Sequence, residues 1–160
     1  MHGQKRTSTW TMIQNTIKPG DYSFTTIEDV DWKVGEMIVV ASTSYDHNEA
    51  EMRMITAVNG RTITVNQKFV YQHYAGVEFY GLTGDKIEMR AEVGLLTRNI
   101  KMMGDDTSVA SDYGSHLMLM GSQDNGFVGK VAYVEFSKCG QPKIVGRYCH
   151  HFHMNGDIPE

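Results

Sequence analysis

Four strand-like runs separated by glycine-bearing corners occupy the last third of the chain and set its fold. They are LLTRNIKMMG (95–104), SHLMLMG (115–121), VAYVEFSKCG (131–140) and KIVGRYCHHFHM (143–154). The first three begin roughly 16 to 20 residues apart, a spacing that suits stacked coils which bury one another's inner faces. The pattern therefore predicts a right-handed parallel β-helix, a form of solenoid, in this part of the chain.

The side chains of a strand alternate between its two faces, so every second residue of a solenoid run should point inward. The residues expected to point inward are Leu117, Leu119, Ala132, Val134 and Phe136. Tyr133 and Glu135 are expected outside. Packed antiparallel sheets would give similar strands, but no further hairpin signal follows residue 93, and this favours the solenoid.

Residues 1–92 contain further strand-like runs and one strong turn signal. The runs are YSFTTI (22–27), MIVVAS (37–42), EMRMITAV (51–58), RTITV (61–65) and KIEMRAE (86–92). Asn59-Gly60 lies between two of them, and both residues tolerate the positive φ of a tight two-residue turn. The sequence thus predicts a β-rich lead-in with an antiparallel hairpin over 1–92, packed on solenoid coils over 93–160. Solenoids need caps and none follows the last run, so we expect the coils to be truncated at the C-terminus.

Composition limits the class of partner. The formal net charge is -4, from 15 basic and 19 acidic residues, so no basic field favours nucleic acid or an anionic membrane. No apolar run approaches the roughly 20 residues of a membrane span, and the first residues lack the hydrophobic segment of a signal peptide. The 16 glycines and 3 prolines, with many β-branched and aromatic residues, indicate an all-β chain.

Two cysteines, Cys139 and Cys149, leave two interpretations open. A single bridge would form in an oxidising compartment, whereas two unpaired thiols would pack as small hydrophobic side chains. Their spacing fits neither a zinc ribbon nor a redox pair. The sequence does not decide between bridge and free thiols.

Three longer segments carry a resemblance to a known family. They are DVDWKVGEMIVVASTSYD (29–46), MRAEVGLLTRNIKMMG (89–104) and GRYCHHFHMNGD (146–157), and the opening HGQKRTSTWT (2–11) looks like the lead-in to the same region. They resemble the region after the eight-glycine domain in a family of large surface proteins. That family includes fibrocystin-L, the cell-surface hyaluronidase called transmembrane protein two, and the cell-migration-inducing hyaluronan-binding protein. Trp10-Thr11 leads to Asp31-Trp32 without room for the lectin-like insert of the hyaluronidase branch, which is the fibrocystin-L arrangement.

The resemblance implies a parallel β-helix within a long extracellular or cell-surface ectodomain. Its partners would be the remainder of that ectodomain and an extracellular polysaccharide. The resemblance admits calcium as a cofactor, although the acidic group Asp46, Glu49 and Glu51 is interpreted as a solvated loop rather than an ion site. Two functions stay open: a structural or adhesive module that contacts glycans without turnover, and part of a glycoside hydrolase acting on a hyaluronan-like polysaccharide. The sequence singles out no catalytic residue, because it does not show which carboxylates would pair for hydrolysis.

His151, His153 and Asp157 are the leading candidates for contact with a sugar or a metal ion. On an extended strand the two histidines share a face, with Cα atoms about 6.5 to 7 Å apart, and Asp157 would complete the site. The structural alternative, which we favour, has the histidines stacked in the coil wall and hydrogen-bonded to neighbouring coils. Asp157 would then accept backbone donors in the Gly156 turn. His150 faces the other way and is expected to be exposed.

Arg90 and Arg98 form a second candidate pair. A guanidinium recognises a carboxylate through two hydrogen bonds, so either arginine could grip an acidic polysaccharide. Arg90 and Glu92 lie on one face, and the alternative, again favoured, is a charge pair across strands that fixes register where the lead-in meets the first coil.

Overall fold

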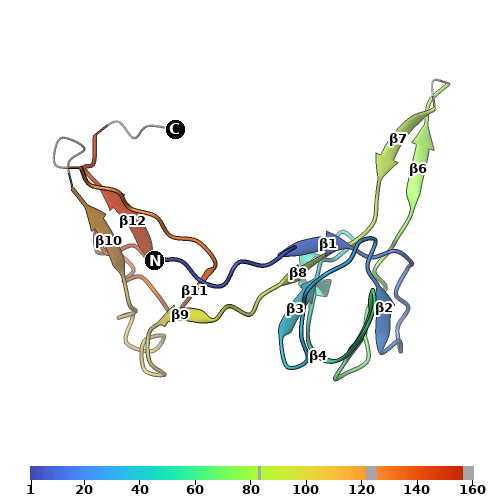
Figure 1. Ribbon diagram of the computed structural model, residues 1–160, viewed down its shortest axis with the longest axis horizontal. Helices are drawn as coiled ribbons and strands as arrows, with labels where there is room; N and C mark the ends of the chain where they lie inside the picture. Colours follow the sequence, from blue (N-terminus) through green and yellow to red (C-terminus); the bar gives the residue numbers. More distant parts are fainter. Residues whose placement is uncertain (83, 122–125, 157–160) are drawn as a thin grey trace. The chain divides into compact units, whose positions relative to one another are not determined.

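The structure is a computed structural model that describes residues 1–82, 84–121 and 126–156 (Figure 1). Its contacts divide the chain into two compact units. Residues 6–97 form one, called here the sheet unit, and residues from Arg98 onward together with Met1–Lys5 form the other, the coil unit. All described elements are strands except one short 3-10 helix, η1 (His47–Glu49), so the predicted all-β class is confirmed. None of the described helices is long and apolar enough to cross a membrane.

The sheet unit is built on one antiparallel sheet of six strands. These are β1 (Trp10–Met12), β2 (Ser23–Thr25), β3 (Met37–Val40), β4 (Glu51–Asn59), β5 (Thr62–Val65) and β8 (Glu92–Leu95). Their order across the sheet is β1-β8-β3-β4-β5-β2. Two further strands, β6 (Val77–Tyr80) and β7 (Asp85–Glu88), pair with each other as a separate hairpin. The run 86–92, predicted as one strand, is therefore divided between β7 and β8.

The six-stranded sheet is curled (Figure 1), and one of its faces carries the core of the unit. Strand β4 shows the pattern: Glu51, Arg53 and Ile55 are buried, while Met52 and Met54 between them are exposed. The buried apolar side chains are Ile13, Ile17, Phe24, Trp32, Ile38, Val40, Ile55, Ile63, Val65, Phe69, Ala91, Val93 and Leu95. Burial of this one face fixes the register of every strand, because a shift by one residue would turn the core side chains to solvent.

The hairpin predicted between runs 51–58 and 61–65 is confirmed. Strand β4 pairs antiparallel with β5, and Asn59 lies opposite Thr62. The two loop residues are therefore Gly60 and Arg61, one position later than predicted. Gly60 has a φ of 56°, a left-handed conformation that costs glycine little.

The coil unit contains four short strands that pair in parallel. They are β9 (Ile100–Met103), β10 (Leu117–Met120), β11 (Val134–Ser137) and β12 (His150–His153). Strand β9 pairs with β11, and β10 pairs with β12, each residue by residue and in parallel. Parallel pairing in the last third of the chain, the main expectation from the sequence, is confirmed.

The length of one coil differs from the sequence-based prediction. Val134 lies opposite Ile100, 34 positions earlier, and His150 lies opposite Leu117, 33 positions earlier. Each strand thus pairs with the second strand after it, so one coil contains two strands. The predicted interval of 16 to 20 residues is half a coil, and the interpretation of each run as a complete coil is wrong. A long coil that contributes one strand to each of two sheets gives strand-like runs at the same interval as a short coil with a single strand. The interval between runs therefore does not distinguish the two.

Strand β10 shows the predicted alternation between its faces. Leu117 and Leu119 are half-buried, whereas Met118 and Met120 are 45% and 61% exposed. The larger exposure of the methionines identifies the leucine face as the better covered side of this strand.

Strand β11 does not show a comparable difference. Tyr133 and Glu135 were expected outside, yet both are half-buried like their neighbours. The Tyr133 ring contacts the His2 ring at 5.3 Å between centroids. The Glu135 carboxylate lies 3.1 Å from the Lys101 ammonium on the paired strand. Other parts of the coil unit therefore cover the face of β11 that the alternation pattern assigns to solvent.

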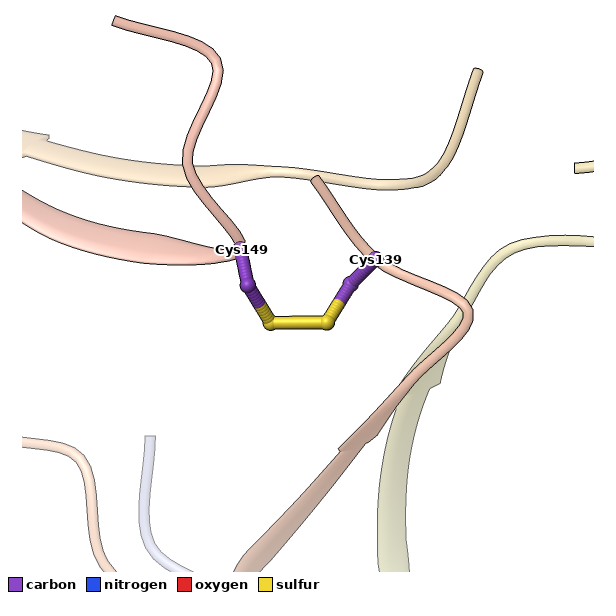
Figure 2. The surroundings of a disulfide bond; sticks show 2 residues. All are labelled: Cys139 and Cys149. Carbon is purple, nitrogen blue, oxygen red and sulfur yellow. A yellow bond between two sulfur atoms is a disulfide. The ribbon is translucent and has the colours of Figure 1, made fainter. Parts of the chain in front are cut away.

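A loop leaves the coil between β11 and β12 and is closed by a disulfide bond (Figure 2). Ser115 pairs with Cys139, and only two residues later Leu117 pairs with His150. The residues between these two partners form the loop, because they have no counterpart on β10. The bond between the two cysteines joins the two ends of the loop beside the coil. Of the two interpretations left open by the sequence, the structure contains the bridge.

Candidate functional site

His151 and His153 lie on the same face of β12, opposite Met118 and Met120 of β10. Their ring centroids are 5.9 Å apart in an edge-to-face arrangement. Both side chains are half-buried. His150, on the other face, is exposed and contacts the Phe136 ring at 5.6 Å. The two candidate histidines therefore stack on each other in the wall of the coil, and His150 faces away from them as predicted.

The imidazole nitrogens of this pair lack partners in the part of the chain that the structure describes. His151 Nδ1 and Nε2 and His153 Nδ1 are covered there without a hydrogen bond, so the predicted bonds to neighbouring coils are not made among these residues. Asp157, the predicted third member of the site, lies outside the described residues. Within the described ranges no group of three or more His, Cys, Asp or Glu side chains could hold a metal ion. Contact of this face with a ligand stays a prediction.

The two candidate arginines belong to different units. Arg90 lies in the sheet unit, where its Nη1 is 2.6 Å from Glu88 Oε2. This partner lies two positions earlier in the same segment, so the pair does not join two strands. Arg98 begins the coil unit and has interactions of its own. Binding of a polysaccharide carboxylate by either arginine also stays a prediction.

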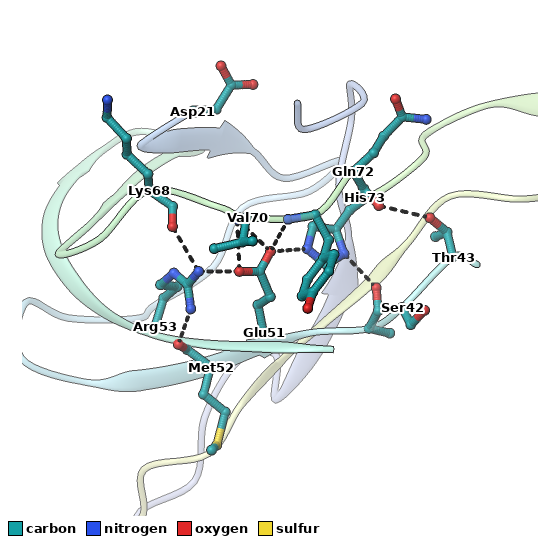
Figure 3. Close-up of polar contacts among 12 residues, drawn as sticks. Asp21, Ser42, Thr43, Glu51, Met52, Arg53, Lys68, Val70, Gln72 and His73 are labelled. Atoms are coloured by element: carbon teal, nitrogen blue, oxygen red, sulfur yellow. Dashed lines mark hydrogen bonds and ion pairs between the residues drawn. The ribbon is translucent and has the colours of Figure 1, made fainter. Parts of the chain in front are cut away.

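A buried charged cluster, which the sequence analysis did not predict, lies at the start of β4 (Figure 3). Its centre is Glu51, whose side chain is 5% exposed. The carboxylate accepts hydrogen bonds from the backbone N–H groups of Val70 and Tyr71, both at 3.0 Å. It also meets His73 Nε2 at 3.0 Å and the guanidinium of Arg53. The interpretation of Glu51 as part of a solvated loop is wrong, because β4 begins at this residue and its side chain points into the core.

Arg53 joins β4 to the chain segment that covers the cluster. Its guanidinium donates hydrogen bonds to the carbonyl oxygens of Gln67 (3.2 Å) and Lys68 (2.8 Å). It also lies over the Phe69 ring, 5.3 Å from the centroid. A buried charge is tolerated only when it is paired and hydrogen-bonded, and these contacts meet that condition. The cluster thus fastens residues 67–73 to the sheet.

His73 is fully buried, and both of its ring nitrogens face acceptors. Nδ1 lies 2.8 Å from the carbonyl oxygen of Ala41, and Nε2 lies 3.0 Å from Glu51 Oε2. A carbonyl oxygen and an ionised carboxylate can only accept, so a ring nitrogen of His73 that carries a proton donates to the acceptor it faces. The Glu51 carboxylate thus lies between the Arg53 guanidinium and the His73 ring.

The protonation of Glu51 links this cluster to pH. Burial opposes ionisation, but the N–H groups of Val70 and Tyr71, with His73 and Arg53, outweigh it and hold the pKa of the Glu51 carboxyl below its ordinary value of 4.5. A depressed pKa in the folded state stabilises the fold above the unfolded-state pKa, and this contribution is lost as pH falls through the folded-state pKa.

We therefore expect the free energy of unfolding of the sheet unit to fall as the pH decreases below 4.5, measured by urea denaturation at a series of pH values. Glu51→Gln should make this fall shallower, because the neutral amide takes up no proton. Equal slopes for the two proteins would contradict the assignment.

Comparison with known proteins connects both units to one group of relatives. Residues 112–160 match the family model described as CEMIP beta-helix. Over 161 residues the chain is 35% identical to a G8 domain-containing protein of Dictyostelium discoideum, a match that covers 99% of this chain and 13% of that protein. Fibrocystin-L of Mus musculus is 31% identical over 199 residues, which cover 99% of this chain and 5% of that protein. The chain is a homologue of fibrocystin-L and of G8 domain-containing proteins. The resemblance noted from the sequence is thus confirmed.

The chain corresponds to a small part of these relatives, because it spans 13% and 5% of the two proteins compared. Among solved structures, the Gp54 tailspike of Acinetobacter baumannii bacteriophage AP22, in complex with a capsular saccharide, covers 94% of this chain and 23% of its own. The sequence identity is 14% and the TM-score 0.41. A likeness at this level supports no conclusion about ligands.

Proposed function

We propose that this chain is a structural and adhesive segment of a long extracellular or cell-surface protein. The coil unit would form rungs of a right-handed parallel β-helix, and the sheet unit would be its lead-in. The observation that carries this proposal is the parallel, residue-by-residue pairing of β9 with β11 and of β10 with β12. Each parallel rung offers the next an equivalent row of backbone donors and acceptors, so rungs stack into a column. Such a column suits spacing and adhesion without turnover.

The disulfide bond supports the proposed location. Cys139 and Cys149 are bonded to each other, and the described chain has no free cysteine. Structural disulfides persist mainly in oxidising compartments and at cell surfaces. The bridge therefore favours an ectodomain.

The histidine face of β12 supports contact with a glycan. The covered nitrogens of His151 and His153 have no partner among the described residues. Leaving such groups unpaired costs about 1–3 kcal/mol each, so a partner from outside this segment is favoured. A sugar hydroxyl both donates and accepts hydrogen bonds, and it can serve either form of a neutral imidazole.

Incubation of the full-length protein with size-defined hyaluronan, with and without calcium, tests the absence of turnover. We expect the hyaluronan chain length to stay unchanged in gel electrophoresis, because the proposed role is contact rather than hydrolysis. Depolymerisation that disappears in His153→Ala would overturn the proposal in favour of a hyaluronan-type hydrolase. His150→Ala is the matched control, because it changes the same strand on its opposite face.

A further inference from the structure

A hollow of about 500 Å³ lies on the sheet unit, on the face of the sheet opposite to the core. Trp10 of β1 and Val39 of β3 both pair with Gly94 of β8, which lies between them. Gly94 has no side chain, so the backbone forms a low floor between the indole and the valine. The segment from Ala41 to His47 supplies much of the remaining wall. The hollow is thus formed within one unit by neighbouring strands of a single sheet.

Trp10 contributes an exposed indole to this hollow. It is 54% exposed, whereas the other tryptophan, Trp32, is 3% exposed and donates its ring N–H to the Ser8 carbonyl oxygen. Among the described residues, neither the Trp10 ring N–H nor the Glu92 carboxylate has a hydrogen-bond partner in the protein. A flat apolar ring therefore lies near one free donor and one free acceptor.

This combination matches the chemistry of a pyranose ring. One face of such a ring presents C–H bonds that pack on an aromatic plane, and its rim carries hydroxyl groups that donate and accept hydrogen bonds. Ser42 and Ser44 add hydroxyl groups to the wall. Their hydroxyls also contact the Asp46 carbonyl oxygen, which fixes the position of the wall.

Charge narrows the class of sugar. Glu92 lines the hollow, and none of the lining residues is a lysine or an arginine. A carboxylated saccharide would bring a second negative charge next to Glu92, with no lysine or arginine among the lining residues to offset the repulsion. An uncharged saccharide avoids this cost, and its hydroxyl groups can donate to the carboxylate.

We propose that the hollow between Trp10 and Val39 binds an uncharged hexopyranose unit of a glycan, stacked on the Trp10 indole with a hydroxyl group bonded to Glu92. This site lies in the sheet unit and goes beyond the proposed role of the coil unit. It differs in ligand class from the acidic polysaccharide considered for Arg90 and Arg98.

Calorimetric titration of the full chain with N-acetylchitotetraose, cellotetraose and mannotetraose tests the proposal, with a hyaluronan tetrasaccharide as the charged probe. We expect at least one neutral probe to bind with a Kd on the order of 1 mM or tighter, and the hyaluronan probe to bind at least about tenfold more weakly. The bound neutral probe should also protect tryptophan fluorescence from iodide quenching, because Trp10 is the exposed one of the two tryptophans.

Variants separate stacking from a general effect on the fold. Trp10→Ala should weaken binding of the neutral probe by about tenfold or more, and Trp10→Phe by less, because it keeps an aromatic plane. Gly94→Val should abolish binding by filling the floor, since a Cβ there meets Val39 Cγ1 at an ordinary 3.7 Å and the strand accepts it. Phe79→Ala is the matched control: Phe79 is 69% exposed on β6 and does not line the hollow.

Four outcomes would overturn the proposal. The first is no binding of any neutral probe at about 10 mM. The second is tighter binding of the hyaluronan probe than of the neutral probes. The third is binding of the neutral probe that is unchanged in both Trp10→Ala and Gly94→Val. The fourth is self-association that depends on Trp10 in sedimentation experiments, which would assign the hollow to a second copy of the chain. None of these outcomes bears on the hyaluronan turnover experiment, so the two proposals fail separately.

Discussion

Glu51→Ala is expected to lower the free energy of unfolding of the sheet unit by about 3–5 kcal/mol. The substitution removes the negative group of the cluster, which leaves the Arg53 guanidinium buried without its counter-charge and His73 Nε2 without its partner. It also deprives the Val70 and Tyr71 N–H groups of their acceptor. Urea denaturation followed by the fluorescence of the buried Trp32 measures the change in the same unit.

Glu28→Ala provides the control for loss of a carboxylate alone. Glu28 is exposed in the same unit, so its removal should change the free energy of unfolding by less than about 0.5 kcal/mol. A similarly small effect of Glu51→Ala would show that the cluster does not hold residues 67–73 on the sheet. Replacement of Glu51, Arg53 and His73 together by apolar side chains of similar volume is expected to cost less than Glu51→Ala, because no unpaired charge remains.

The sequence predicted those features of the fold that depend on local patterns. Alternation along 115–121 predicted the better covered face of β10, and Asn59-Gly60 predicted the hairpin to within one position. Recurring strand-like runs predicted parallel pairing but gave half of the true coil length. A strand-like run indicates that a strand occurs. Which strand it pairs with depends on the number of turns in the chain before it returns to the same sheet.

The charged cluster shows why part of the site could not be predicted. Glu51, Arg53 and Ile55 have the spacing of one strand face, and this alternation was the available signal for an inward carboxylate. Two charges next to a polar turn are more often solvated than buried. Burial is favourable here because Val70 and His73, about 20 residues further along the chain, supply the donors. Such partners become visible only when the fold brings the two segments together.

The disulfide bond raises the same problem for the coil unit. Ten positions separate the two cysteines in the sequence, a spacing that fits a bridge or two free thiols equally well. Pairing within the coil brings the two cysteines close enough to form the bond, because Cys139 pairs with Ser115 just before Leu117 pairs with His150. The cysteines thus lie at the two ends of a loop that the coil itself has already brought together.

Cys139→Ser is accordingly expected to destabilise the coil unit by about 2–3 kcal/mol, the entropy of closing a loop of this size in the unfolded chain. The effect should be greatest at β12, because Cys149 directly precedes that strand. Its carbonyl oxygen accepts a hydrogen bond from the Leu117 N–H at 3.0 Å. Amide hydrogen exchange measures it: residues 150–153 should exchange faster in the variant, with a smaller change at β9 and β11.

Two controls separate loss of the bond from loss of a side chain. Combined Cys139→Ser and Cys149→Ser should match the single variant and should not respond to reductant, whereas the unmodified protein treated with reductant should come to resemble both. Unchanged exchange at 150–153, or an equal increase in all four strands of the coil unit, would contradict a local role for the bond. With the bond intact, the loop ends stay beside β10 and the His151–His153 face keeps its register. Without the bond, the loop is no longer closed, and we expect larger fluctuations of β12, the strand that carries both candidate histidines.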